Sequence, residues 1–149
     1  MSVNPDLQGR SYPPTAPYAV GREKIREFAA AVQAAHPAHA DVEAARALGH
    51  ADLVAPPTFA VVLAQRAEQA VVQDPDSGID FSRVVHADER FTHHRPIVAG
   101  DELVATATVE AVKSLGGHSM VTTRADIATV AGEPVSTVRS TLLVRGEDA

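Results

Sequence analysis

The chain of 149 residues contains no cysteine and no tryptophan. The absence of cysteine excludes disulfide bonds, a thiol nucleophile and a cysteine-ligated metal site. Aromatic residues make up only 4% of the chain, so we expect a core of alanine, valine and leucine side chains. Each of these small side chains buries little apolar area, and an oligomer interface would add the burial that a thin core lacks.

Long apolar runs and blocks of basic residues are also absent. No stretch of about 18 apolar residues is present to span a bilayer, and residues 1–16 have neither the basic start nor the apolar centre of a signal peptide. The formal net charge is −6, which argues against binding to a nucleic-acid backbone. We therefore expect no membrane partner, no nucleic-acid partner and, by default, a cytoplasmic location.

The length and an apolar fraction of 45% predict one folded domain. Residues 1–17 carry four prolines and predict an extended N-terminal arm, ordered only if something docks it, so the domain is expected over residues 18–149. A short strand is expected at residues 18–20. Apolar periodicity predicts a helix over residues 22–33, and Asp41 is expected to cap a second helix over residues 42–48.

The clearest helical pattern begins at residues 55–59 and runs to about Gln73. Pro57 suits a first helical turn, where its missing N–H would have no intrahelical partner. One apolar stripe follows at helical spacing, formed by Phe59, Val62, Leu63, Ala67, Ala70 and Val71. Gln65, Glu68 and Gln69 lie off this stripe, so one side of the helix is expected to be wet or to meet a polar partner.

Downstream of this helix the pattern changes to strands separated by glycine and proline. Four strands are predicted, over residues 82–93, 101–112, 118–130 and 134–145. Gly116-Gly117 and Gly132-Glu133 lie where hairpin turns are expected. One helix followed by long antiparallel strands predicts an α+β fold in which a curved sheet wraps around a long central helix.

The segment Arg95-Pro-Ile-Val-Ala-Gly-Asp-Glu-Leu103 contains a strand-initiating turn, in which Asp101 suits accepting from backbone N–H groups. A structural role for Asp101 is therefore favoured over catalysis. The segment resembles the P-x-x-x-G-D-x-L motif of MaoC-like hydratases and dehydratases, which have the hotdog fold. Residues 22–33, 48–50 and 53–59 are similar, more narrowly, to an actinobacterial branch that contains the non-catalytic subunits of heterodimeric (3R)-hydroxyacyl-ACP dehydratases. The resemblance covers about residues 18–145.

The resemblance implies a catalytic Asp–His pair on the loop after the first helix. The histidine moves the α proton, the aspartate holds the water or hydroxyl at the β carbon, and a backbone N–H holds the thioester oxygen. The family pattern resembles D-x-N-P-x-H-x-D-P, and on residues 34–42 it places His39 at the catalytic histidine and Ala34 at the catalytic aspartate. Alanine offers no functional group, so half of the pair is missing, as the non-catalytic subunits tolerate. Without the resemblance, His39 is also interpretable as a loop histidine on a partly exposed turn.

The resemblance thus implies a subunit that binds an acyl-CoA or acyl-ACP thioester in fatty acid metabolism. Its partner would be a second MaoC-like chain, or itself, in a hetero- or homodimer, and no cofactor is expected. Residues expected to contact the substrate are Pro57, Thr58, Phe59 and His36, with His39 near the mouth of an acyl tunnel. Two alternatives stay open: a homodimeric hydratase or thioesterase that uses His39 with His36 or Asp41, and an inactive acyl-CoA-binding module.

The seven histidines do not have the spacing of a metal site. His36 and His39 flank a proline, and the adjacent His93 and His94 point to opposite faces of a strand, so no metal is expected. A basic cluster could dock a phosphopantetheine carrier, CoA or an acidic carrier protein; its members are Arg83, Arg90, His93, His94 and Arg95. The alternative is a solvated strand face balanced by Asp88 and Glu89.

Overall fold

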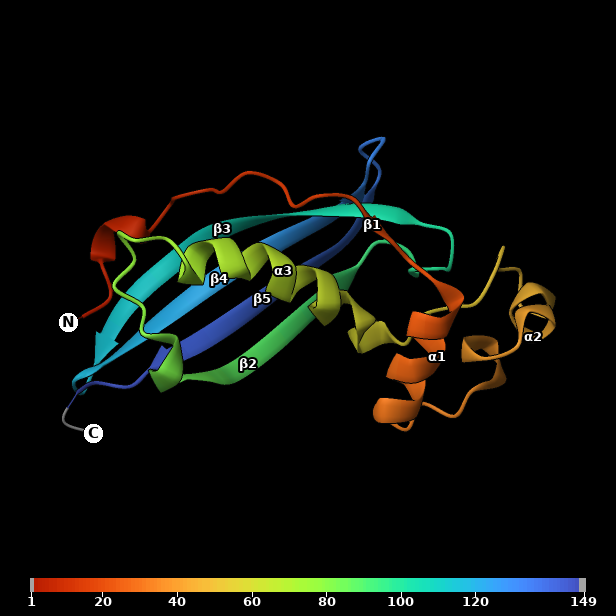
Figure 1. Cartoon of the computed structure of the whole chain (residues 1–149), viewed down its shortest axis with the longest axis horizontal. Helices are drawn as coiled ribbons and strands as arrows, with labels where there is room; N and C mark the ends of the chain where they lie inside the picture. The colour runs from red at the N-terminus through yellow and green to blue at the C-terminus, as the bar shows by residue number, and fades with distance from the viewer. Residues whose placement is uncertain (1, 148–149) are drawn as a thin grey trace.

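The computed structural model describes residues 2–147, in which a five-stranded antiparallel sheet curves around one long helix (Figure 1). The strand order is β1–β3–β4–β5–β2. The strands are β1 (Tyr18–Ala19), β2 (Val84–His93), β3 (Glu102–Leu115), β4 (His118–Thr129) and β5 (Pro134–Val144). The predicted α+β architecture is confirmed, and β3 extends three residues beyond its predicted end because its hairpin with β4 stays paired up to Leu115 and His118. Met1, Asp148 and Ala149 lie outside the described residues.

The central helix α3 (Ala60–Val72) is preceded by a 3₁₀ turn, η3 (Pro57–Phe59), where a single α-helix was predicted. Pro57 occupies the first position of that turn, as its missing N–H allows. The buried face of α3 includes Leu63, Ala67 and Val71. Ala70, assigned to the same stripe from the sequence, is exposed, because the helix packs on one side only.

The sheet presents its concave face to α3, and the helix packs mainly on β3 and β4. On β3 the alternate residues Leu103, Ala105, Ala107 and Val109 are completely buried beneath it. The strict alternation of β3 therefore places these apolar side chains in the core and the intervening threonines, Thr106 and Thr108, on the outer face of the sheet.

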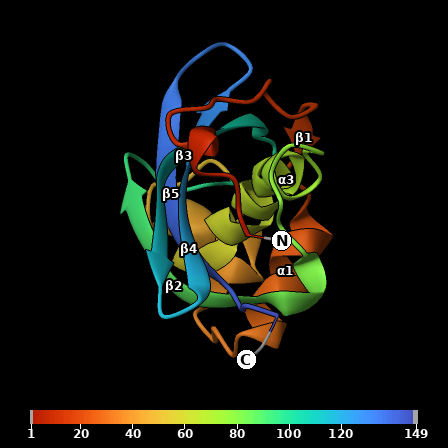
Figure 2. The same ribbon diagram turned by 90° about the vertical axis from the view of Figure 1, so that its left-hand side faces the viewer.

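The N-terminal arm lies along the free edge of β3, and Figure 2 shows it passing over the sheet beside α3. The backbone N–H groups of Gly9, Tyr12 and Thr15 donate to carbonyls of β3 at 2.8–2.9 Å. Val3 and Leu7, the latter in a short 3₁₀ turn η1 (Pro5–Leu7), are buried in the same core as α3. The arm thus closes one edge of the sheet, whereas β2, at the other edge, pairs only with β5 among residues 2–147.

A helical excursion lies beyond one end of the sheet (Figure 1) and contains α1 (Arg22–Ala31), the 3₁₀ turn η2 (Pro37–His39) and α2 (Val42–Ala47). Helix α1 ends two residues before its predicted end because Gln33 adopts a left-handed φ of 59°. A last 3₁₀ turn, η4 (Phe81–Arg83), leads into β2. No helix within residues 2–147 has the length and hydrophobicity needed to cross a membrane.

Candidate functional site

His39 lies at the end of η2 and is half-buried. Its Nδ1 atom is 2.6 Å from the carbonyl oxygen of Val54. A carbonyl oxygen only accepts, so Nδ1 is the donor, and the neutral ring then carries no proton on Nε2. The fold therefore orients His39 with a bare Nε2, the form that a general base needs.

Backbone hydrogen bonds hold the His39 turn against two distant segments. The N–H of Val54 donates to the carbonyl of Ala38 at 3.0 Å, which ties η2 to the segment before α3. That segment in turn pairs with residues 97–99, through Ala55 N–H to Ile97 oxygen at 2.8 Å and Ala99 N–H to Leu53 oxygen at 2.9 Å. Two of the pieces that carried the family resemblance, residues 53–59 and 95–103, are thus joined to each other, and the first of them holds the His39 turn.

Asp101 has the structural role that the sequence favoured. Arg95 donates from Nη1 and Nη2 to the two carboxylate oxygens of Asp101 at 2.9 and 3.0 Å, and the Val98 N–H donates to Oδ2 at 3.0 Å. This bidentate contact raises the pKa of the Arg95 guanidinium. All of these bonds serve the turn before β3, so Asp101 is not directed at a substrate.

Within residues 2–147, no carboxylate completes a pair with His39. Ala34 stands directly after α1, where its N–H donates to the carbonyl of Ala29 at 2.8 Å. The two other candidate partners are used as caps: His36 Nδ1 accepts from the Ala38 N–H at 3.1 Å, and Asp41 Oδ1 accepts from the Glu43 N–H at 2.9 Å. Among residues 2–147, no ion pair includes His39, and no group of three His, Asp or Glu residues is placed to hold a metal.

The expected substrate contacts differ in exposure. Pro57 and Thr58 are exposed at the start of η3, whereas Phe59 is completely buried. The Phe59 ring packs edge to face on Phe28, with ring centroids 5.3 Å apart and an interplanar angle of 75°. Phe59 therefore lies inside the core, beneath the exposed Pro57 and Thr58 of η3. The contact of these residues and of the exposed His36 with an acyl chain stays a prediction.

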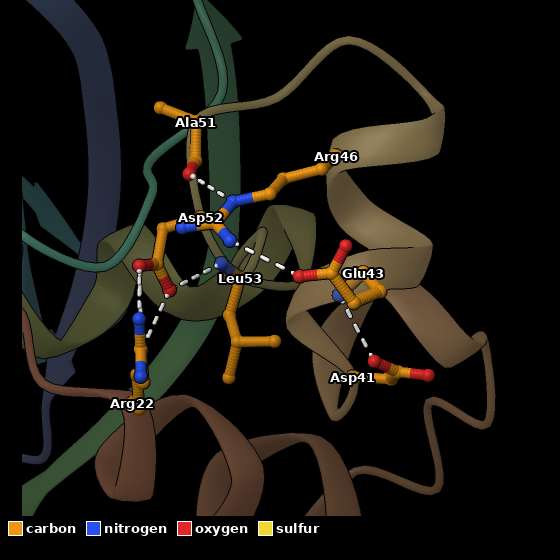
Figure 3. A network of polar contacts seen from close by, with 7 residues as sticks. All are labelled: Arg22, Asp41, Glu43, Arg46, Ala51, Asp52 and Leu53. Carbon is orange, nitrogen blue, oxygen red and sulfur yellow. Dashed lines mark hydrogen bonds and ion pairs between the residues drawn. The ribbon is translucent and has the colours of Figure 1, made fainter.

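Sequence reasoning missed the ion pair that ties α1 to the segment before α3 (Figure 3). Arg22 donates from Nε to Oδ1 of Asp52 at 3.0 Å and from Nη2 to Oδ2 at 2.7 Å. Asp52 also accepts from the Leu53 N–H at 2.7 Å. These bonds, with Arg22 as the main cause, lower the pKa of Asp52 to about 2. The only signal in the sequence was the position of Asp52 between two segments that resemble the family.

A groove of about 650 Å³ lies beside α3 on the side that faces β2. Its lining includes Glu68 of α3, His86 of β2 and Leu142 of β5. Glu68 is 5% exposed and accepts from the Thr123 hydroxyl at 3.1 Å. The sequence indicated a polar side of α3 but not that a carboxylate on it is buried.

The basic cluster is not a free cationic patch. Arg83 lies 3.4 Å from Asp80, Arg90 lies 3.7 Å from Asp88, and Arg95 binds Asp101 and Glu133. The arrangement agrees with the alternative of a strand face whose charges are balanced by carboxylates.

Comparison with known proteins supplies the family context for this geometry. Residues 6–138 match the family model described as FAS1-like, dehydratase domain region. A UPF0336 protein of Leifsonia xyli subsp. xyli is 62% identical over 148 residues, with 99% of both chains covered. A UPF0336 protein of Clavibacter michiganensis subsp. michiganensis is 58% identical and covers 100% of both.

Two solved structures share the overall fold. A chain of the HadBC (3R-hydroxyacyl-ACP dehydratase) complex from Mycobacterium tuberculosis is 38% identical, with a TM-score of 0.83 over 93% of this chain and 97% of that one. A MaoC-like dehydratase is 36% identical, with a TM-score of 0.87 over 95% of this chain but only 43% of that one. The second protein is therefore more than twice as long as the region that it shares with this chain.

Proposed function

This chain belongs to the family of FAS1-like dehydratase domain regions, within the MaoC-like hotdog superfamily, and on this premise we propose that it is the non-catalytic, acyl-thioester-binding subunit of a heteromeric (3R)-hydroxyacyl dehydratase. Its substrate would be an ACP or CoA thioester. A second MaoC-like chain would supply the complete Asp–His pair.

The proposal depends above all on one observation, the half-complete pair at His39. Dehydration needs proton transfer at one carbon and departure of hydroxyl from the next, so it requires two positioned groups. His39 presents a bare Nε2, but position 34 is alanine, and His36 and Asp41 are engaged as caps. A chain with this arrangement has kept the shape of the site without its second functional group.

The open edge of the sheet supports a partner chain. The N-terminal arm covers β3, whereas β2 leaves its outer backbone groups without a strand among residues 2–147. Phe81 and Val85 beside this edge are 68% and 44% exposed. An added strand would satisfy the backbone groups and bury these apolar side chains, so a second hotdog chain is expected to pair at β2.

The proposal is tested by a hydration assay with crotonyl-CoA and a longer trans-2-enoyl thioester. We expect no turnover from the purified chain alone and turnover after addition of the MaoC-like chain from the same cell that carries both Asp and His. In the mixture, His39→Ala is expected to keep kcat within about twofold, because the reacting groups belong to the partner. The matched control is His36→Ala, which changes the neighbouring histidine that caps η2.

Two outcomes contradict the proposal. Turnover by the chain alone that is lost in His39→Ala would make His39 the base of a homodimeric hydratase or thioesterase. Thioester binding without turnover in any mixture would identify an inactive acyl-CoA-binding module.

A further inference from the structure

Helix α3 packs less on the β5 side of the concave sheet face than on the β3 side. The helix packs mainly on β3 and β4, and the face turned to it becomes polar toward β5 and β2. Three titratable side chains lie on this side: Glu68 of α3 and His86 of β2, which line the groove beside α3, and Glu89 of β2, which lies on the same face of its strand but outside the groove lining. We call the space beside them the acidic groove; it opens toward the free edge strand β2.

Glu68 is a buried carboxylate with an incomplete set of partners. Its Oε1 accepts from the Thr123 hydroxyl at 3.1 Å, and its Oε2 lies 3.9 Å from His86 Nε2, beyond hydrogen-bond distance. The side chain is 6% exposed, so water compensates little of its charge. A buried carboxylate requires a cation or several hydrogen bonds, and this one has a single hydroxyl at bonding distance.

Glu89 adds a second carboxylate to the same face. Its Oε2 accepts from the Ser140 hydroxyl at 2.8 Å. Burial raises the pKa of Glu89, and the charges of Glu68 and Asp88 raise it further, while Ser140 and His86 act in the opposite direction. Glu68 and Glu89 therefore act on each other as like charges on this side of the sheet.

No lysine or arginine of the described chain neutralises these carboxylates. Lys24 and Arg66 line the groove, but Arg66 lies over the ring of Tyr18, 4.7 Å from its centroid. Of the ion pairs within residues 2–147, only the one with His86 involves Glu68, and none involves Glu89. Lys24 lines the groove but forms no ion pair with either carboxylate within residues 2–147, so a cation at ion-pair distance from them would come from a partner that covers this edge.

We propose that the acidic groove selects a different hotdog chain over a second copy of this one, by accepting a lysine or arginine side chain of that partner. The proposal rests on the proposed function and specifies the chemistry of its partner. A second copy paired antiparallel at β2 would extend the concave face and bring another Glu68 and Glu89 beside the first. Like charges at a covered interface oppose association, whereas a complementary cation favours it.

The register of β2 shows that a second copy of this chain would place no lysine or arginine of β2 beside Glu68 and Glu89. Glu89 pairs with Ser140, which is buried on the concave face, whereas Arg90 pairs with Arg139, whose side chain reaches Glu110 on the outer face. Arg90 therefore points away from the groove, and the concave side of β2 brings only Val84, His86, Glu89, Phe91 and His93. Of these, only the two histidines are able to carry a positive charge, and none is a lysine or an arginine.

The test measures self-association of the full chain by sedimentation velocity between pH 5 and pH 8. Glu89→Gln keeps the size and the Ser140 contact but removes the charge, and it is expected to tighten self-association at pH 7.5 about tenfold, as the loss of one like-charge repulsion implies. The wild-type chain is expected to associate more tightly at pH 5, and Glu89→Gln to lose most of this pH dependence. Glu68→Gln is a second, independent variant with the same expected direction.

Asp88→Asn is the matched control, because it removes one negative charge from the same strand but on the opposite face, beside Thr141. It is expected to change the association constant much less than Glu89→Gln does, because Asp88 lies on the other face and its charge acts on Glu89 less than that of Glu68. The inference is overturned if Glu89→Gln and Glu68→Gln leave self-association unchanged, or if Asp88→Asn matches them.

A second arm measures binding to the MaoC-like chain used in the hydration assay. Glu89→Gln is expected to weaken this pairing about tenfold, and tighter pairing would overturn the inference. Because both arms measure association and not turnover, their failure is distinguishable from failure of the proposed function, which is decided by the hydration assay.

Discussion

Replacement of Phe59 by alanine tests whether this residue belongs to the core or to a substrate-binding surface. Phe59 is completely buried and packs edge to face on Phe28. Removal of a buried phenylalanine side chain costs about 3–5 kcal/mol, including the cavity that it leaves. For a chain of this size each kcal/mol lowers Tm by roughly 2–4 °C, so Phe59→Ala is expected to lower Tm by about 6–20 °C.

The assay is urea unfolding at one protein concentration, compared with Phe81→Ala as a matched aromatic control. Phe81 is 68% exposed, and its replacement is expected to change stability by no more than about 0.5 kcal/mol. A double-mutant cycle with Phe28→Ala is expected to give a coupling energy of about 0.5–1.5 kcal/mol from the aromatic contact. If Phe59→Ala is as mild as Phe81→Ala, Phe59 is not a core residue and the structural account of η3 is refuted.

Two further perturbations follow from single contacts. Arg22 lowers the folded-state pKa of Asp52 from its ordinary value of 3.8 to about 2, so this ion pair stabilises the fold above about pH 4. The contribution is lost as pH falls from about 4 to about 2. Tm of Asp52→Asn should be lower than wild type at pH 7 and converge with it near pH 2; a constant difference would contradict the assigned pKa. Gly78→Ala would place a Cβ 2.4 Å from the Ser2 carbonyl at a φ of +68°, whereas Gly132→Ala, at a φ of +98°, meets nothing within 4 Å. Gly78→Ala is therefore expected to destabilise more and to expose the N-terminal arm to limited proteolysis, and equal effects would show that the arm is not held at this point.

Local patterns in the sequence were sufficient to predict the main helices and strands of the fold. Alternation along residues 101–112 and helical spacing from Phe59 to Val71 are properties of neighbouring residues, and they predict a strand and a helix without knowledge of the rest. The strand-initiating segment ending at Leu103 indicated the family for the same reason. The docking of the N-terminal arm was not predictable, because its bonds join Gly9, Tyr12 and Thr15 to a strand about 90 to 100 residues away.

The candidate site was predictable only in part. The absence of a functional group at Ala34 is a fact of sequence, and so is the presence of His39. The tautomer of His39 depends on the Val54 carbonyl, and the caps formed by His36 and Asp41 depend on where η2 and α2 begin. Hydrogen bonds between a side chain and the nearby backbone can be predicted only when the local backbone conformation is known.

The sequence by itself determined the α+β class, the order of elements, the family and the missing aspartate, because each follows from residue identity or from short-range periodicity. Only the tertiary structure decided that Phe59 faces the core, that Arg22 meets Asp52, and that Glu68 and Glu89 lie on the same side of the sheet near its open edge. These pairings join residues 21 to 31 positions apart through the packing of helix on helix, loop on helix and helix on sheet. Periodicity places a side chain on a face of its own element, but what that face meets is set by how the elements pack.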